Sequence, residues 1–315
     1  MATFLTDSGS IRRLTIPETV TFSGSIFISA SVTITGSLVQ GNNIANGIDS
    51  HAQGFSTTAS GQYSHSEGSS SVASGVASHA EGYATTASGQ YSHAEGRQTL
   101  AFGTASHAEG YLTTASGNYS HAEGSLTISY GFASHAEGFG SWTFGTGSHA
   151  EGSSTRTYGD YSHAEGSATS TQGTGSHSEG QSTVAYGDYS HAEGYLTVAS
   201  GSYSHAEGHS TTARGTGSHA MGIGTTADAD YQTVTGHYNI PTSDSRSVFI
   251  IGGGNSSTQA NIVTFWKTGS NGGGTMILHF VSSSYSASSD ADAGNKGVPL
   301  GGIYRSGSDL KIRIT

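Results

Sequence analysis

Histidine and glutamate residues that recur at one fixed interval are the residues of this chain best suited to chemistry. The element Ser-His-(Ala/Ser)-x-Gly returns every 14 residues, and in eleven successive copies a Glu stands two residues after the His. An imidazole beside a carboxylate can serve as an acid–base pair, as ligands for a divalent cation, or as part of a buried polar network. The paired residues are His65, Glu67, His79, Glu81, His93, Glu95, His107, Glu109, His121, Glu123, His135, Glu137, His149, Glu151, His163, Glu165, His177, Glu179, His191, Glu193, His205 and Glu207.

Catalysis does not fit this repetition. Ser, His and Glu together are the residue types of a hydrolase, but a catalytic site is a single constellation with a pocket and an oxyanion hole. The thirteen copies of the His element, from His51 to His219, offer neither feature. We therefore expect no catalytic residue and no enzyme activity.

The repeat also predicts the element that positions these residues. Each period holds two half-periods of seven residues, marked by one Gly after the Glu position, such as Gly82, and another seven residues later, such as Gly89. Seven residues suit one short strand and a tight turn. We expect each period to form a flat coil of two strands, with a fixed Gly at each turn because φ is positive or the coils approach closely. Thirteen coils stacked at about 4.8 Å would form a rod about 60 Å long.

Residue size predicts which side chains lie inside each coil. Small residues such as Thr85, Ala87, Ser92 and Ala94 share one parity, and only small side chains fit inside a two-stranded coil. The opposite parity points outward, and it varies on one strand but is almost always His and Glu on the other. A constant outward surface favours burial against an equally regular partner, and the simplest such partner is another copy of the chain.

The Ser-His-Ala-Glu-Gly pattern resembles the 14-residue repeat of trimeric autotransporter adhesin heads of the YadA-like type. The resemblance covers residues 43–236, with His where that family usually has Val and Glu where it has Ile. It implies an all-β fold, a left-handed parallel β-roll that assembles as a homotrimer. Arrays of this form look like those of phage tail fibres and tail-associated proteins. The segments 249–254 and 297–305 are similar to segments of phage structural proteins.

Within such a trimer the His and Glu residues have two remaining roles. Three histidines from three chains at one level could present nitrogens to a divalent cation. The adjacent Glu already offers each His a partner, so we favour a structural role in which each His donates to a Glu of a neighbouring chain. We expect the ladder from His65 to Glu207 to form the trimer interface, with the His pKa raised by the carboxylates. We expect no metal and no cofactor.

Composition narrows the partners and the location. The formal net charge is −11 and the chain has no Cys, which argues against nucleic acid, an anionic membrane surface, disulfides and thiolate metal sites. No basic segment followed by an apolar one opens the chain, and no apolar stretch nears about 18 residues. We expect no signal peptide, no membrane insertion, synthesis in a host cytoplasm, and a place in a virion or extracellular particle. A bacterial cell surface is the alternative.

The predicted organisation has three parts. Residues 1–42 read as an N-terminal β segment for attachment or entry, residues 43–236 as the β-roll shaft, and residues 237–315 as a C-terminal β domain. Short alternating stretches at 25–29 and 32–35 are candidate strands of the first part. Four candidate strands belong to the third part, at 247–251, 261–267, 275–281 and 309–314.

Two outward features of the variable strand suggest further functions. Aromatic residues concentrate in coils 100–160, and the candidates for a lateral patch that binds glycan or another fibre are Phe102, Tyr130, Trp142, Phe144 and Tyr158. Exposed aromatics also suit strand surfaces without any ligand. A Thr column that includes Thr57, Thr85 and Thr99 resembles an ice-binding ladder, but its parity places it inside the coil.

The sequence thus predicts a structural fibre or spike of a phage tail or phage-like particle. Such a protein gives rigid reach and mediates attachment to a cell surface. Its expected partners are two further copies of the chain, other particle or tail proteins, and a cell-surface glycan or protein receptor. The alternatives are a bacterial surface adhesin of the trimeric autotransporter type and an ice-binding solenoid.

Overall fold

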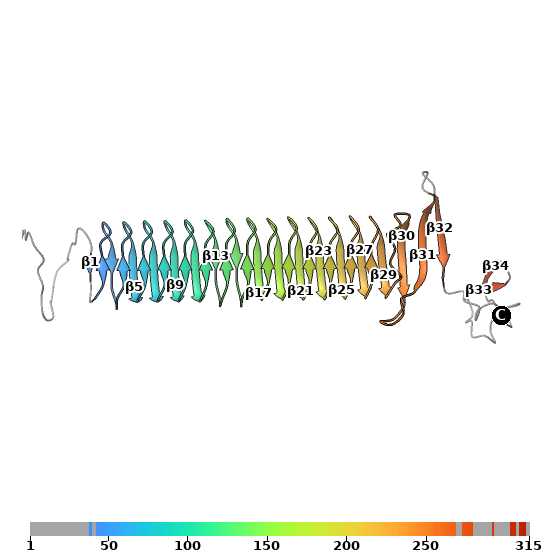
Figure 1. Ribbon diagram of the computed structural model, residues 1–315, viewed down its shortest axis with the longest axis horizontal. Coiled ribbons are helices and arrows are strands. Elements are labelled where there is room, and N and C mark those ends of the chain that lie inside the picture. The colour runs from blue at the N-terminus through green and yellow to red at the C-terminus, as the bar shows by residue number, and fades with distance from the viewer. Residues whose placement is uncertain are drawn as a thin grey trace, which may run out of the picture. The chain divides into compact units, whose positions relative to one another are not determined.

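The computed structural model describes residues 38–39, 42–268, 273–279, 292, 303–306 and 309–312. The candidate strands at 25–29 and 32–35 lie outside these residues. The described elements are β-strands, and most of them belong to two parallel sheets, A and B, that face each other. Figure 1 shows the strands stacked side by side from β3 to β30. No helix in the described segments is long and apolar enough to span a bilayer.

Sheet A contains the histidine-bearing strands. Each strand pairs in parallel with the strand 14 residues further on, so that His79 aligns with His93 and Glu81 with Glu95. The strands of this parallel stack are β1 (Leu38–Val39), β3 (His51–Ala52), β5 (His65–Ser69), β7 (His79–Tyr83), β9 (His93–Arg97), β11 (His107–Tyr111), β13 (His121–Ala122), β15 (His135–Ala136), β17 (His149–Ser153), β19 (His163–Ser167), β21 (His177–Gln181), β23 (His191–Tyr195), β25 (His205–His209), β27 (His219–Ile223), β29 (Thr233–His237) and β30 (Ser247–Gly253).

Sheet B contains the shorter strands with variable outward residues. Its strands have two residues each and also pair in parallel with a 14-residue offset, as Thr86 does with Leu100. They are β2 (Ile44–Ala45), β4 (Thr58–Ala59), β6 (Val72–Ala73), β8 (Thr86–Ala87), β10 (Leu100–Ala101), β12 (Thr114–Ala115), β14 (Ile128–Ser129), β16 (Trp142–Thr143), β18 (Arg156–Thr157), β20 (Ser170–Thr171), β22 (Val184–Ala185), β24 (Val198–Ala199), β26 (Thr212–Ala213) and β28 (Thr226–Ala227).

The core between the sheets is a stack of small side chains. Ala87 and Ala94 are fully buried, as are Thr85 and Ser92 to within 1%. The inner serines satisfy their hydroxyls locally, since Ser92 Oγ donates to the carbonyl of Gly89 at 2.7 Å. The expected inward parity is therefore confirmed, and the described chain is an all-β parallel solenoid of 14-residue coils.

The corners of the coil are formed by residues other than the repeat glycines. Ala84 and Tyr91 have φ angles of 54° and 59°, and their N–H groups donate to the carbonyls of Ser69 and Val76 in the preceding coil, both at 2.8 Å. A Cβ on Gly89 would instead overlap the backbone of the next coil. This Gly is present because the coils approach closely, which is one of the two reasons the sequence suggested.

The last coil leads into antiparallel strands. β30 still pairs in parallel with β29, then β31 (Asn261–Thr268) pairs antiparallel with β30, and β32 (Gly273–Leu278) with β31. A separate hairpin joins β33 (Ile303–Ser306) and β34 (Asp309–Ile312). These strands overlap the four candidate strands predicted after residue 237.

Candidate functional site

The histidines form one straight column on the outward face of sheet A. Because each His occupies the same position in its coil, every ring lies over the ring 14 residues earlier. From His51 to His219, successive ring centroids are 4.6–5.0 Å apart and the planes differ by 2–12°. The spacing equals the distance between neighbouring strands in a sheet. The backbone pairing, rather than attraction between rings, therefore sets the column.

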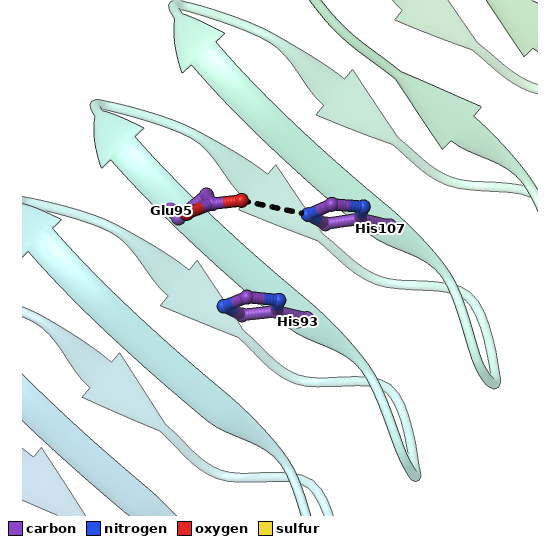
Figure 2. A group of neighbouring side chains, drawn as sticks. All are labelled: His93, Glu95 and His107. Carbon is purple, nitrogen blue, oxygen red and sulfur yellow. Dashed lines mark hydrogen bonds and ion pairs between the residues drawn. The ribbon is translucent and has the colours of Figure 1, made fainter.

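The glutamates form a second column beside the first, and each His lies closest to a Glu of the preceding coil. His107 Nε2 is 3.2 Å from Glu95 Oε1, and His135 Nε2 is 3.1 Å from Glu123 Oε1 (Figure 2 shows the first pair). Contacts within one coil are longer, as between His65 and Glu67 at 3.8 Å. The spacing of two residues in the sequence is therefore not the shortest contact.

Most of the imidazole nitrogens that face the carboxylates make no hydrogen bond. Between residues 42 and 268, the hydrogen bonds of ladder histidines to Glu are those of His107 and His135. The Nε2 atoms of the other ladder histidines are shielded from solvent and have no hydrogen-bond partner: His51, His65, His79, His93, His121, His149, His163, His177, His191, His205 and His219. The histidine side chains as a whole remain 31–37% exposed wherever they lie near a Glu.

The expected rise in the His pKa is wrong for six histidines of the single chain. Burial, followed by the charge of neighbouring histidines, lowers the pKa of His93, and the carboxylate of Glu95 only partly offsets this. The same two causes come first at the other five histidines, which are His65, His79, His149, His177 and His205. These imidazoles are therefore neutral near pH 7, with a free lone pair on one nitrogen.

The glutamate column alternates in acidity. Hydrogen bonding with Glu151, then burial, raises the pKa of Glu137 to about 7. Hydrogen bonding with Glu165 and Glu137 instead lowers the pKa of Glu151. A protonated carboxyl that donates to ionised neighbours above and below explains this pattern, because stacked carboxylates this close repel when all are ionised. The pKa is also raised to about 7 at Glu81, Glu165 and Glu193.

An open groove runs beside the glutamate column. The repeat glycines next to the glutamates have no side chain, so the surface is hollowed along sheet A. One stretch of about 610 Å³ is lined by Glu179, Glu193 and Glu207, and another of about 490 Å³ by Glu137, Glu151 and Glu165. This groove is open along its length, unlike the enclosed pockets that hold small substrates.

The predicted lateral residues lie on the opposite face and partly stack. Tyr130 and Phe144 are 5.2 Å apart between ring centroids, Phe144 and Tyr158 are 4.9 Å apart, and Trp142 meets Phe144 edge-on at 6.4 Å. Ser116 occupies the corresponding position in the coil between Phe102 and Tyr130, so Phe102 is set apart from the stack. The structure thus places four of the five candidates in one aromatic cluster.

A row of exposed tyrosines at one corner of the coil was missed by the sequence reasoning. Tyr63, Tyr91 and Tyr119 are 57–60% exposed and occupy every second coil, while Ala77 and Ala105 occupy the coils between them. Each ring covers the small corner residue 14 positions earlier, as Tyr161 covers Gly147. The alternation of Tyr with Ala or Gly just before the inner Ser was the signal available in the sequence.

The Thr column considered for ice binding faces the core. Thr57 is 1% exposed, and Thr85 and Thr99 are fully buried. Ice binding needs a regular hydroxyl face in contact with solvent, which this column does not provide. No known protein family matches the chain, and no curated protein matches it significantly.

Proposed function

We propose that this protein is a structural fibre or spike of a phage tail or phage-like particle, in which three left-handed solenoids associate through their His and Glu columns. The single observation that carries the proposal is the unbroken outward face of sheet A, where His121, Glu123 and their equivalents repeat in register over the whole stack. Such regularity serves no single binding event, but it suits a partner with the same period.

The groove beside the glutamates supports the association. It follows the stack axis, and its walls repeat every coil, so an edge of an identical solenoid would meet the same surface at each level. A homotrimer of parallel rods would cover nitrogens and carboxylates that are about one-third exposed in one chain. The rod would then carry terminal β elements toward another particle protein or toward a cell-surface receptor.

Sedimentation equilibrium and electron microscopy of the purified full-length chain test the proposal. A homotrimer has three times the chain mass of 32.0 kDa. Replacing His121, His135 and His149 together by Ala should lower the melting temperature and shift the mass toward the monomer. The matched control replaces three outward residues of sheet B, Thr86, Thr114 and Val184, by Ala. A monomeric parent protein, or a triple His variant with unchanged melting temperature and mass, would refute the association.

Attachment is tested separately by adsorption of the labelled trimer to bacterial cells, with the genes beside its own as a second observation. Neighbouring tail genes and saturable adsorption to a host support the particle role. Neighbouring secretion genes would favour instead the bacterial surface adhesin that the repeat also resembles.

A further inference from the structure

We propose that the outer face of sheet A binds divalent transition-metal cations, one to every second coil, each held by two histidines of adjacent coils and the glutamate that lies between them. The site is complete within one chain, so it does not depend on the proposed trimer. Figure 2 shows one such group, in which His93 and His107 lie on either side of the Glu95 side chain.

The donor atoms of these groups lie close enough to converge. In each group, one ring nitrogen from each His and one carboxylate oxygen lie within 4.8 Å of one another. Four groups share no residue and recur along the column: His93, Glu95 and His107; His121, Glu123 and His135; His149, Glu151 and His163; His205, Glu207 and His219.

The nitrogens are available to a cation. The Nε2 atoms of His93, His121 and His149 are shielded from solvent and make no hydrogen bond, although a carboxylate lies 3.3–3.8 Å away. A buried polar atom without a partner is costly, and a cation would satisfy it. The sequence-based expectation of no metal assumed that each Glu saturates a His, and at these nitrogens the hydrogen bond is not formed.

Ring spacing explains why one cation would occupy two coils. A zinc–nitrogen bond is about 2.0–2.1 Å, so two nitrogens on one ion are at most about 4.2 Å apart. The rings of His121 and His135 are stacked at 4.7 Å and nearly parallel, so both must tilt toward the ion. A ring that tilts toward one neighbour tilts away from the other, which leaves the next interval empty. The fifth group, around Glu193, shares His205 with the group around Glu207 and would compete with it.

The carboxylates support the same period and phase. The pKa is lowered at Glu95, Glu123, Glu151 and Glu207, the glutamates of the four independent groups. These carboxylates are the ones that remain ionised near pH 7.

The ligand set indicates the class of metal. Two imidazoles with one carboxylate suit Zn²⁺, Co²⁺, Ni²⁺ or Cu²⁺, whereas Mg²⁺ and Ca²⁺ prefer oxygen ligands alone. Three protein ligands leave at least one position on the ion for water.

Equilibrium dialysis of the full-length chain, first stripped with chelator, tests the proposal with Zn²⁺ as the probe and Mg²⁺ as the comparison. We expect four or more Zn²⁺ per chain and no retained Mg²⁺. The double variant H121Q/H135Q should lose one ion per chain, and E123Q should weaken that site. The control H209Q/H237Q, which removes two histidines outside the ladder, should keep the parent stoichiometry. Circular dichroism verifies that each variant is folded.

Spectroscopy and stoichiometry give distinct ways to overturn the inference. Bound Co²⁺ should show the visible absorption of low-coordinate nitrogen and oxygen ligation, reduced by one site in H121Q/H135Q. No retained Zn²⁺, an unchanged count in that variant, or one ion per coil would each overturn it. A monomer that binds four ions would refute only the proposed trimer, and a trimer without ions would refute only this site.

Discussion

The Nε2 atom of His107 lies 3.2 Å from Oε1 of Glu95, although the two residues are twelve positions apart and belong to successive coils. The stacking of coils, rather than the two-residue spacing within each coil, brings imidazole and carboxylate together. The ladder is therefore continuous along the axis of one chain, since each Glu lies between the histidines of two levels. The consequences can be measured in variants of single residues.

The alternation in the glutamate column predicts opposite pH responses at two neighbouring positions. The Glu137 carboxyl, which faces Glu123, Glu151 and His149, has a pKa of about 7, above its usual value. It favours the folded state below pH 4.5, and that contribution is lost as the pH rises through 7. Gln keeps a donor to Glu151 at every pH. E137Q should therefore raise the melting temperature by about 1–4 °C at pH 8, with little change at pH 4, in buffer containing EDTA.

The matched variant E123Q should respond with the opposite sign. Burial raises the pKa of Glu123, but hydrogen bonding with Glu137, Glu109 and His135 outweighs this and lowers it. A lowered pKa stabilises the folded state above the usual pKa and loses that effect as the pH falls. E123Q should thus lower the melting temperature by about 1–4 °C at pH 8. Equal shifts in the two variants at pH 8 would contradict the alternation.

Close approach of the coils predicts different tolerance at two nearby glycines. A Cβ at Gly145 would overlap the carbonyl of Gly159 and lie 2.9 Å from the Asp160 nitrogen, so G145A should destabilise the fold by about 1–3 kcal/mol. Gly147 has φ of 60°, and a Cβ there would meet only the movable ring of Tyr161. Its equivalent, Ala133, already holds φ of 52°. G147A should therefore be nearly neutral in urea unfolding, and the idea fails if the two variants are alike.

The end of sheet B predicts a capping role for one buried amide. Asn239 occupies the position of the inner Thr, and its side chain pairs with both backbone groups of Thr226, accepting from N at 2.7 Å and donating to O at 2.9 Å. N239A leaves both groups unpaired on an open strand edge, so we expect a loss of about 1–3 kcal/mol and faster aggregation. The exposed Asn118, which accepts from Thr104, supplies the control N118A. Light scattering with equal aggregation for both would contradict the role.

The aromatic cluster predicts lateral recognition of glycans through Trp142. The guanidinium of Arg156 lies 5.1 Å from its ring centroid, and Phe144, 38% exposed, meets the ring edge-on. W142A should weaken glycan retention at least about tenfold on an array, the effect of losing one contact of about 1.4 kcal/mol. V198A, at the equivalent position of a coil without aromatics, is the control. Equal retention by the parent and W142A would leave the cluster without a binding role.

The sequence by itself determined the coil. A strict 14-residue period with small residues at one parity has few physical solutions, because only stacked flat coils bury Ala87 and Thr85 while His93 and Glu95 face outward. Local spacing also located the strands near Asn261 and Ser247. These features depend on alternation along one strand, which can be read from neighbouring residues.

Only the tertiary structure decided how the ladder is wired. The contact of His107 with Glu95, the lowered pKa of His93, the alternation between Glu137 and Glu151 and the corner tyrosines depend on distances between residues of different coils. A one-dimensional pattern fixes which side chains face outward, but it does not fix the offset at which successive coils align their atoms. That offset is set by the backbone hydrogen bonds of the stacked strands, and it determines which nitrogen meets which carboxylate.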